Sequence, residues 1–178
     1  MQFEKNDKQE RFVLFTGRIV MYYESTRGGI KSILAAEAIK RGIAPDGGLF
    51  VPEERIQLSA EQIKKLVNMN YRERALEILK YFIDDYTQEE IAECVNSAYT
   101  EDKFGSSDIA PVVRLNENVH ILELRHGPTC AFKDMALQVL PYLLASSIQT
   151  VGLDAEVLIL TATSGDTGKA ALEGFKDA

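Results

Sequence analysis

The chain has 178 residues, of which 46% are hydrophobic and 26% are charged, a composition typical of a globular protein rather than a disordered or collagen-like one. Its 20 Lys and Arg residues and 27 Asp and Glu residues give a net charge of −7, which argues against a nucleic-acid partner but still permits a small anionic substrate in a locally positive pocket. Two cysteines cannot build a disulfide framework, and no stretch approaches the roughly 20 apolar residues of a membrane span. We therefore expect a cytoplasmic protein with no membrane partner.

Residues 1–20 are expected to be an extension or tail. Residues 1–11 carry charged side chains of mixed sign, and no apolar segment of signal-peptide length follows, because residues 16–18 interrupt it. Met21 is therefore a candidate start of the folded part.

Residues 21–100 show helical spacing and are expected to form a small, mostly helical N-terminal domain. A hydroxyl or amide side chain followed three residues later by Glu or Gln predicts a capped helix start, and glycine at a helix end predicts its stop. The predicted elements are, in order, a helix capped by Ser32 that runs to Lys40 and stops at Gly42, a turn at 44–48, a strand at 49–51, a helix opened by Ser59 and Gln62, a helix within Tyr71–Phe82, and a helix opened by Thr87 and Glu90.

From residue 101 onward, short apolar runs replace the helical spacing, at 111–115, 119–124 and 157–162. A helical run at 132–148 lies between the last two, and Pro141 is expected to kink or split it. This order predicts an α/β fold in which residues 101–178 begin a parallel βα domain. Because so few strands with open edges do not make a stable parallel sheet, we expect the chain to be the truncated N-terminal piece of a larger protein.

Two loops each follow a predicted strand and open a helix, the position where open α/β sheets collect their ligands. In the first, residues 125–134, Lys133 stands in or just before the first helical turn, where the helix dipole and burial both favour loss of its proton. A neutral lysine amine can form an imine with a carbonyl, whereas the alternative is a solvent-facing lysine. We expect His126 and Arg125 to be loop or surface residues and Cys130 to be a small buried residue.

The second loop, residues 163–168, combines two glycines that permit tight turns with the hydroxyls of Ser164 and Thr167. Together with the N–H groups of a helix start, these features predict a nest for a carboxylate or a phosphate. The alternative is an ordinary turn capped by a Ser or Asp side chain. The spacing of His, Cys and acidic residues suggests no metal site.

Four motifs resemble threonine synthases in the right order: Tyr23–Gly28, Gly42–Pro52, His126–Asp134 and Thr161–Ala171. The resemblance covers the chain apart from its tail. It implies a fold-type II enzyme dependent on pyridoxal 5′-phosphate, with the loop for the cofactor phosphate downstream of the present sequence.

The resemblance also implies residue roles. Lys133 would carry the cofactor as a Schiff base and then act as general base and acid. The four residues that follow Thr163 would contact the substrate carboxylate or the 3-hydroxyl of the cofactor ring: Asp166 is assigned to the cofactor, and Ser164, Gly165 and Thr167 to the substrate.

Asp134, next to the implied attachment site, would either orient the lysine loop or cap its helix, and capping is the expectation. The implied activity is that of a carbon–oxygen lyase in threonine biosynthesis, which converts O-phosphohomoserine and water to L-threonine and phosphate. Two alternatives stay open: a phospho-lyase that releases 2-oxobutyrate, and a non-catalytic fragment or interaction module. The sequence does not indicate the oligomeric state.

Overall fold

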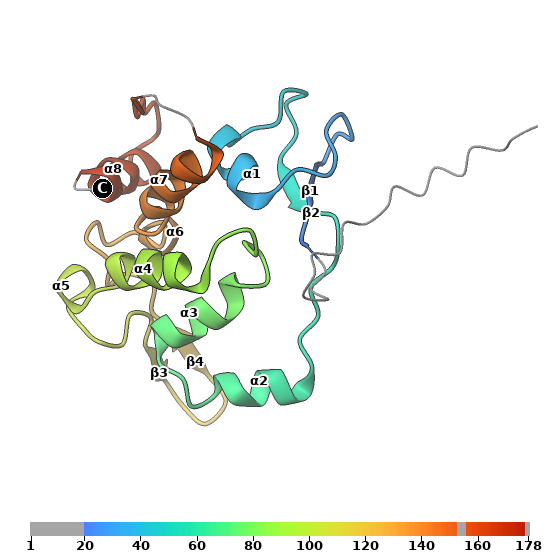
Figure 1. The fold of residues 1–178 in the computed structure, drawn as a ribbon. Coiled ribbons are helices and arrows are strands. Elements are labelled where there is room, and N and C mark those ends of the chain that lie inside the picture. Colours follow the sequence, from blue (N-terminus) through green and yellow to red (C-terminus); the bar gives the residue numbers. More distant parts are fainter. Residues whose placement is uncertain (1–19, 153–155, 177–178) are drawn as a thin grey trace, which may run out of the picture.

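The computed structural model describes residues 20–152 and 156–176; all of the predicted tail except Val20 lies outside the described residues. The described part is mostly helical, with four short strands (Figure 1). The elements are β1 (Tyr23–Ser25), α1 (Ala35–Arg41), β2 (Phe50–Pro52), α2 (Ala60–Leu66), α3 (Tyr71–Leu79), α4 (Gln88–Ala98), α5 (Glu101–Phe104), β3 (Val112–Arg114), β4 (His120–Leu122), α6 (Asp134–Leu137), α7 (Leu140–Val151) and α8 (Asp166–Phe175).

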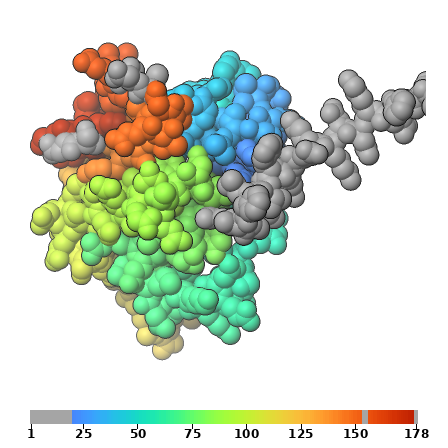
Figure 2. All heavy atoms as spheres, viewed as in Figure 1, coloured from blue at the N-terminus to red at the C-terminus, as the bar shows by residue number. Residues whose placement is uncertain are grey.

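The hydrophobic core lies where α7 packs against α1 and α4, and α3 covers α4 on another side (Figure 1). Ile91, Val95 and Ala98 are buried on one face of α4, at the spacing of an amphipathic helix. Leu143 of α7 joins them, so the core draws side chains from both sides of residue 101. In the space-filling view, α1 and α7 form one continuous surface (Figure 2). The predicted domain boundary near residue 101 stays a prediction.

Local capping chemistry explains where several helices begin. The predicted boxes are confirmed: Ser59 caps α2 and Thr87 caps α4, each with a reciprocal bond from the side chain three residues on. Asn70 and Glu73 form a third box at the start of α3, which the sequence analysis overlooked although the same pattern is present. Pro141 lies in the first turn of α7, and the predicted helical run is split there into α6 and α7.

The start of α1 differs from the prediction. Ser32 does not cap this helix: its φ of 56° lies in the left-handed region, whereas a capping residue needs extended backbone. Its backbone N–H and its hydroxyl instead donate to Glu53. A free N–H group in the first turn of α1 is instead satisfied by a residue distant in sequence: Ala36 N donates a hydrogen bond to Asp85 Oδ2 at 2.9 Å.

The two N-terminal motifs lie against each other, with β1 and β2 paired antiparallel between them. Asp46 joins them: Oδ1 accepts from Ser25 Oγ at 2.7 Å and from Gly48 N at 2.9 Å, and Oδ2 accepts from Gly29 N at 2.9 Å. These bonds, the one from Ser25 first among them, lower the pKa of Asp46. The motifs therefore brace one another, and the predicted turn at 44–48 is confirmed by the bond from Gly47 N to Ala44 O.

The sequence analysis predicted a parallel arrangement of the runs at 119–124 and 157–162 across the helix between them, and the described part of the chain shows no parallel pairing. β3 and β4 pair antiparallel, with Val113 opposite Ile121, and their hairpin projects at the lower edge of the molecule (Figures 1 and 2). The link between the two strands has only five residues, 115–119, whereas a parallel crossover needs a dozen or more. Asn116 Oδ1 closes the turn by accepting hydrogen bonds from Asn118 N and Val119 N.

The third predicted strand, 157–162, forms no strand in the part of the chain that the structure describes. Leu158 and Leu160 are 88% and 90% exposed, so their side chains bury little against this chain. The observed fold class is therefore mixed α/β, mostly helical, with two small antiparallel sheets. None of the helices in the described ranges is long and apolar enough to cross a membrane.

Candidate functional site

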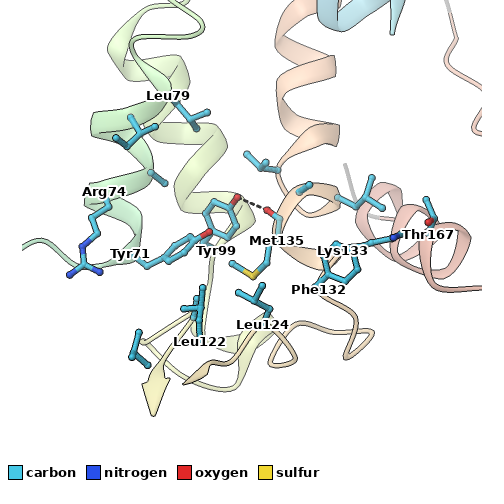
Figure 3. A pocket seen from close by; sticks show the side chains of 17 residues that line it. Tyr71, Arg74, Leu79, Tyr99, Leu122, Leu124, Phe132, Lys133, Met135 and Thr167 are labelled. Atoms are coloured by element: carbon cyan, nitrogen blue, oxygen red, sulfur yellow. Dashed lines mark hydrogen bonds between the residues drawn. The ribbon is translucent and has the colours of Figure 1, made fainter. Parts of the chain in front are cut away.

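Lys133 ends the loop before α6 and holds the N-cap position of that helix. The residue is half-buried, and its Nζ lies 4.3 Å from the centre of the Phe132 ring. Figure 3 shows the Lys133 side chain directed toward Thr167 of α8, with Phe132 beside it. A ring face at this distance attracts an ammonium group, so Phe132 helps to fix where the amine lies.

Asp134, the next residue, is wholly buried at 0% exposure. Its carboxylate turns back into the loop: Oδ2 accepts from Thr129 N at 2.8 Å and Oδ1 accepts from Thr129 Oγ1 at 2.7 Å. No side chain caps α6. The expectation that Asp134 caps its helix is therefore wrong, and the carboxylate ties the lysine loop to itself.

Two further residues show how tightly this loop is folded. Gly127 is buried, and a Cβ there would lie 2.5 Å from Asp134 Oδ2, so only glycine leaves room for the carboxylate. Cys130 has a φ of 60° and is exposed, which overturns the expectation of a small buried residue. Its side chain lies outside the core because the turn that seats Thr129 points the next residue outward.

Two basic residues of the loop, Arg125 and His126, both contact the carboxylate of Glu123. His126 Nε2 lies 2.7 Å from Glu123 Oε2, and Arg125 Nη2 lies 3.2 Å from Glu123 Oε1. The bond with His126, then that with Arg125, lowers the pKa of Glu123. Neither His126 nor Arg125 lines the cavity described below, in agreement with their assignment as loop or surface residues.

The second loop is closed by Thr163. Its Oγ1 accepts from Gly165 N at 3.2 Å and from Gly168 N at 2.9 Å, and a Cβ on Gly168 would lie 2.7 Å from the same oxygen. Thr163 thus fills the capping role that the sequence analysis allowed for a Ser or Asp side chain. The first two amides of α8, those of Asp166 and Thr167, have no hydrogen-bond partner among the described residues.

The two loops meet because α8 packs on α6. Gly174 lies so close to the carbonyl of Leu137 that a Cβ there would clash with the backbone. A direct bond joins the loops as well: Lys169 Nζ donates to Thr129 O at 3.2 Å. The sequence analysis gave Lys169 no role, since nothing in its local pattern identifies a partner 40 residues away.

A cavity of about 850 Å³ opens between α3, the β3–β4 hairpin and α6 (Figure 3). Lys133 and Thr167 both line it, so the structure brings one predicted residue from each loop together. Ser164, Gly165 and Asp166 are exposed and do not line it. Its walls are mainly apolar, and the cavity is open to solvent, because Val112, Leu122 and Phe132 on its wall are exposed.

Tyr71 and Tyr99 form part of the cavity wall, and the sequence analysis gave neither residue a place in a site. Their rings pack edge to face with centres 4.9 Å apart. The Tyr99 hydroxyl donates to Met135 O at 2.7 Å, which connects α4 to α6. Burial, chiefly, raises the pKa of Tyr99, so it acts as a neutral donor. No group of three or more possible metal ligands occurs among residues 20–152 and 156–176.

Comparisons with known proteins identify the family. A model of the threonine synthase N terminus matches residues 22–99. Threonine synthase from Methylobacillus glycogenes is 40% identical over 162 residues, covering 85% of this chain. A crystal structure of PLP-bound threonine synthase from Brucella melitensis superposes with a TM-score of 0.80 at 39% identity, covering 87% of this chain. The chain belongs to the threonine synthase family. The resemblance that the four motifs indicated is thereby confirmed.

The match covers only part of each relative. The chain spans 33% of the Methylobacillus threonine synthase and 33% of the Brucella chain, so it corresponds to about a third of these proteins. Human threonine synthase-like 1 is 45% identical over 143 residues, which are 79% of this chain and 19% of that protein. The structural match places the described fold within the N-terminal part of a threonine synthase.

Proposed function

We propose that this protein serves the threonine synthase reaction, in which O-phosphohomoserine and water give L-threonine and phosphate, with pyridoxal 5′-phosphate attached at Lys133. Membership of the family supports the reaction class, that of a carbon–oxygen lyase. The observation that carries the assignment of the residue is the Lys133 amine on the wall of a large apolar cavity that it shares with Thr167. Both belong to motifs that resemble the family.

The residues present fit the aldehyde end and the ring of the cofactor. Lys133 offers a half-buried primary amine, the one group needed for attachment. A volume of about 850 Å³ lies within the usual size of small-molecule sites, ~300–1,000 Å³. The apolar walls and the ring of Phe132 suit a flat aromatic ring. A cradle for the phosphate is not apparent among the residues that line the cavity in the described chain.

The chain's own residues account for binding and proton movement. When bound, pyridoxal phosphate supplies an electron sink for charge that develops at the substrate's α-carbon. Lys133 Nζ, once released from the cofactor by the substrate amine, would take and return protons on the face of the substrate that it adjoins. The apolar walls would pack against the ring of the cofactor, and the open side of the cavity would admit the substrate and the water that reacts with it.

The start of α8 would hold the substrate. The open amides of Asp166 and Thr167, with the hydroxyls of Ser164 and Thr167 and the tight turn at Gly165, suit a carboxylate. Asp166 lies outside the cavity wall, and its assignment to the cofactor rests on the resemblance of its motif alone. In the active protein, Asp166→Ala should therefore lower turnover while the cofactor stays attached to Lys133, and an unchanged rate would remove Asp166 from the site.

Substitution of Lys133 tests the attachment. We expect the chain mixed with pyridoxal phosphate to develop a visible absorbance that borohydride reduces. Lys133→Ala should lose most of both, leaving only the slower labelling of exposed lysines such as Lys31. Lys31→Ala is the matched control, because this lysine is exposed beside β1 and should leave the signal unchanged. A signal of undiminished size in Lys133→Ala would refute the assignment.

The chain is similar to a threonine synthase-like protein as well as to threonine synthases. The phospho-lyase outcome, which the resemblance leaves open, is therefore the second candidate. Both reactions begin from O-phosphohomoserine and need the same lysine. Product analysis separates them: threonine supports the synthase, and 2-oxobutyrate supports the phospho-lyase. A chain that takes the label on Lys133 and forms neither product would support the non-catalytic alternative.

A further inference from the structure

We propose that Asp134 is a positioning residue, which acts through Thr129 to fix the loop that presents Lys133, and that Lys169 holds the same Thr129 peptide to α8. The inference rests on the proposed function, since it concerns the placement of the same amine. It goes beyond that function by assigning roles to three residues that contact neither the substrate nor the cofactor in the proposal.

The carboxylate of Asp134 is committed wholly to one residue. Its two oxygens accept hydrogen bonds from Thr129 N at 2.8 Å and from Thr129 Oγ1 at 2.7 Å, and it has no exposed surface. The loop leaves room for this carboxylate only because residue 127 is glycine: a side chain there would collide with Asp134. A buried carboxylate satisfied by two donors is strongly held, whereas the loss of either donor leaves a costly unpaired group.

Thr129 is fixed from both of its backbone groups. Its N–H and hydroxyl meet Asp134, while its carbonyl accepts from Lys169 Nζ at 3.2 Å. The amide of Cys130 continues the turn by donating to Gly127 O at 3.0 Å. The peptide between Thr129 and Cys130 is thus the point at which the lysine loop is joined to α8.

This junction determines where Lys133 points. Asp134 and Lys133 are neighbours in sequence, so a carboxylate held at Thr129 sets the start of α6 and with it the direction of the lysine side chain. Thr167 lies two residues before Lys169 on α8, so the bond to Thr129 O also sets the distance between the two sides of the cavity. A shift of about 1 Å in such a group is enough to lower a reaction rate strongly.

The test measures how fast Lys133 is labelled. The chain is incubated with pyridoxal phosphate, reduced with borohydride at intervals, and mapped by peptide mass spectrometry, with exposed Lys31 as the internal reference. The variants are Asp134→Asn, Thr129→Val, Thr129→Ser and Lys169→Met. Thr87→Ala, which removes a cap on α4 far from the loop, is the control for general destabilisation.

Labelling of Lys133 relative to Lys31 should fall about tenfold in Asp134→Asn and Thr129→Val, the factor expected for the loss of one charge-assisted hydrogen bond. Thr129→Ser keeps the hydroxyl and should stay within about twofold of wild type. Lys169→Met should lower the ratio by less, and Thr87→Ala should leave it unchanged. Rescue by serine is the outcome that a general loss of stability does not produce.

The experiment distinguishes failure of the positioning role from failure of the proposed function. If wild-type Lys133 is labelled but Thr129→Val and Thr129→Ser are labelled equally fast, the positioning role is overturned and the proposed function stands. If Lys133 of the wild-type chain takes no label, the proposed function fails and the positioning role fails with it. Should Asp134→Asn not fold, the pair of Thr129 variants still decides, since both keep the amide bond to Asp134.

Discussion

Asp85 lies between α3 and α4 but accepts a hydrogen bond from α1, which is distant in sequence. Its Oδ2 accepts from Ala36 N in the first turn of α1, while Oδ1 is buried without a hydrogen-bond partner among the described residues. Burial raises the pKa of Asp85, and the charges of Asp84 and Glu90 add to the shift. Charge and burial therefore oppose one another at this carboxylate.

The raised pKa predicts how stability depends on pH. The folded chain holds the Asp85 proton more tightly than the unfolded chain, so this group's contribution is complete below its ordinary pKa of about 3.9 and is lost as pH rises through the raised value. Asp85→Asn keeps an acceptor for Ala36 N but carries no charge. Between about pH 4 and about pH 7, the unfolding free energy of wild type should therefore decline relative to that of Asp85→Asn.

Urea denaturation at several pH values measures this difference. Carboxylates with lowered pKa values act in the opposite direction in both proteins, which is why the comparison with the variant is needed. Asp102→Asn, at an exposed position of α5, is the control and should show no such trend. A constant difference between wild type and Asp85→Asn would contradict the account.

At the scale of elements, patterns within a few residues were enough to predict most helices. Capping boxes place the starts of α2 and α4, and Pro141 divides α6 from α7, because each of these effects depends on neighbours in the sequence. Ser32 has the right residue type and spacing but the wrong backbone. Its conformation depends on Glu53, 21 residues away, which no local pattern reveals.

Substitution of Thr87 and of Ser32 should therefore affect stability to different extents. Thr87→Ala should lower the unfolding free energy by about 1 kcal/mol, because the Oγ1 that accepts from Glu90 N is lost. Ser32→Ala should change it by less than ~0.5 kcal/mol, since Ser32 caps no helix and its bonds are exposed. Thermal and urea unfolding of both variants measure the contrast, and equal losses would show that Ser32 caps α1 after all.

At the scale of the whole molecule, strand pairing could not be predicted, because apolar runs do not specify their partners. The short link between β3 and β4 indicates a hairpin, whereas the predicted crossover joined 119–124 to 157–162, and the latter run forms no strand among the described residues. That the two loops lie close together could be predicted from their places at the starts of helices, and Lys133 and Thr167 do line one cavity; the roles of these residues stay predictions. The junction at Thr129 could not be predicted, because it joins residues far apart in the chain.

The apolar run at 157–162 leads to a prediction for the molecule as a whole. Replacing exposed Leu158 and Leu160 together by Lys should leave the unfolding free energy, measured by urea denaturation, within ~0.5 kcal/mol of wild type. Leu143→Ala, at a buried position of α7, is the contrast and should cost about 2–5 kcal/mol. A large loss of stability in the double variant would show that these leucines are buried in solution.

The central claim is that one amine, at the junction of the lysine loop and α6, receives the cofactor. Peptide mapping of the wild-type chain, loaded with pyridoxal phosphate and reduced with borohydride, tests it most directly. The account predicts that the peptide containing Lys133 carries the reduced adduct in preference to every other lysine. A reduced adduct found mainly on another lysine, with Lys133 unmodified, would contradict it.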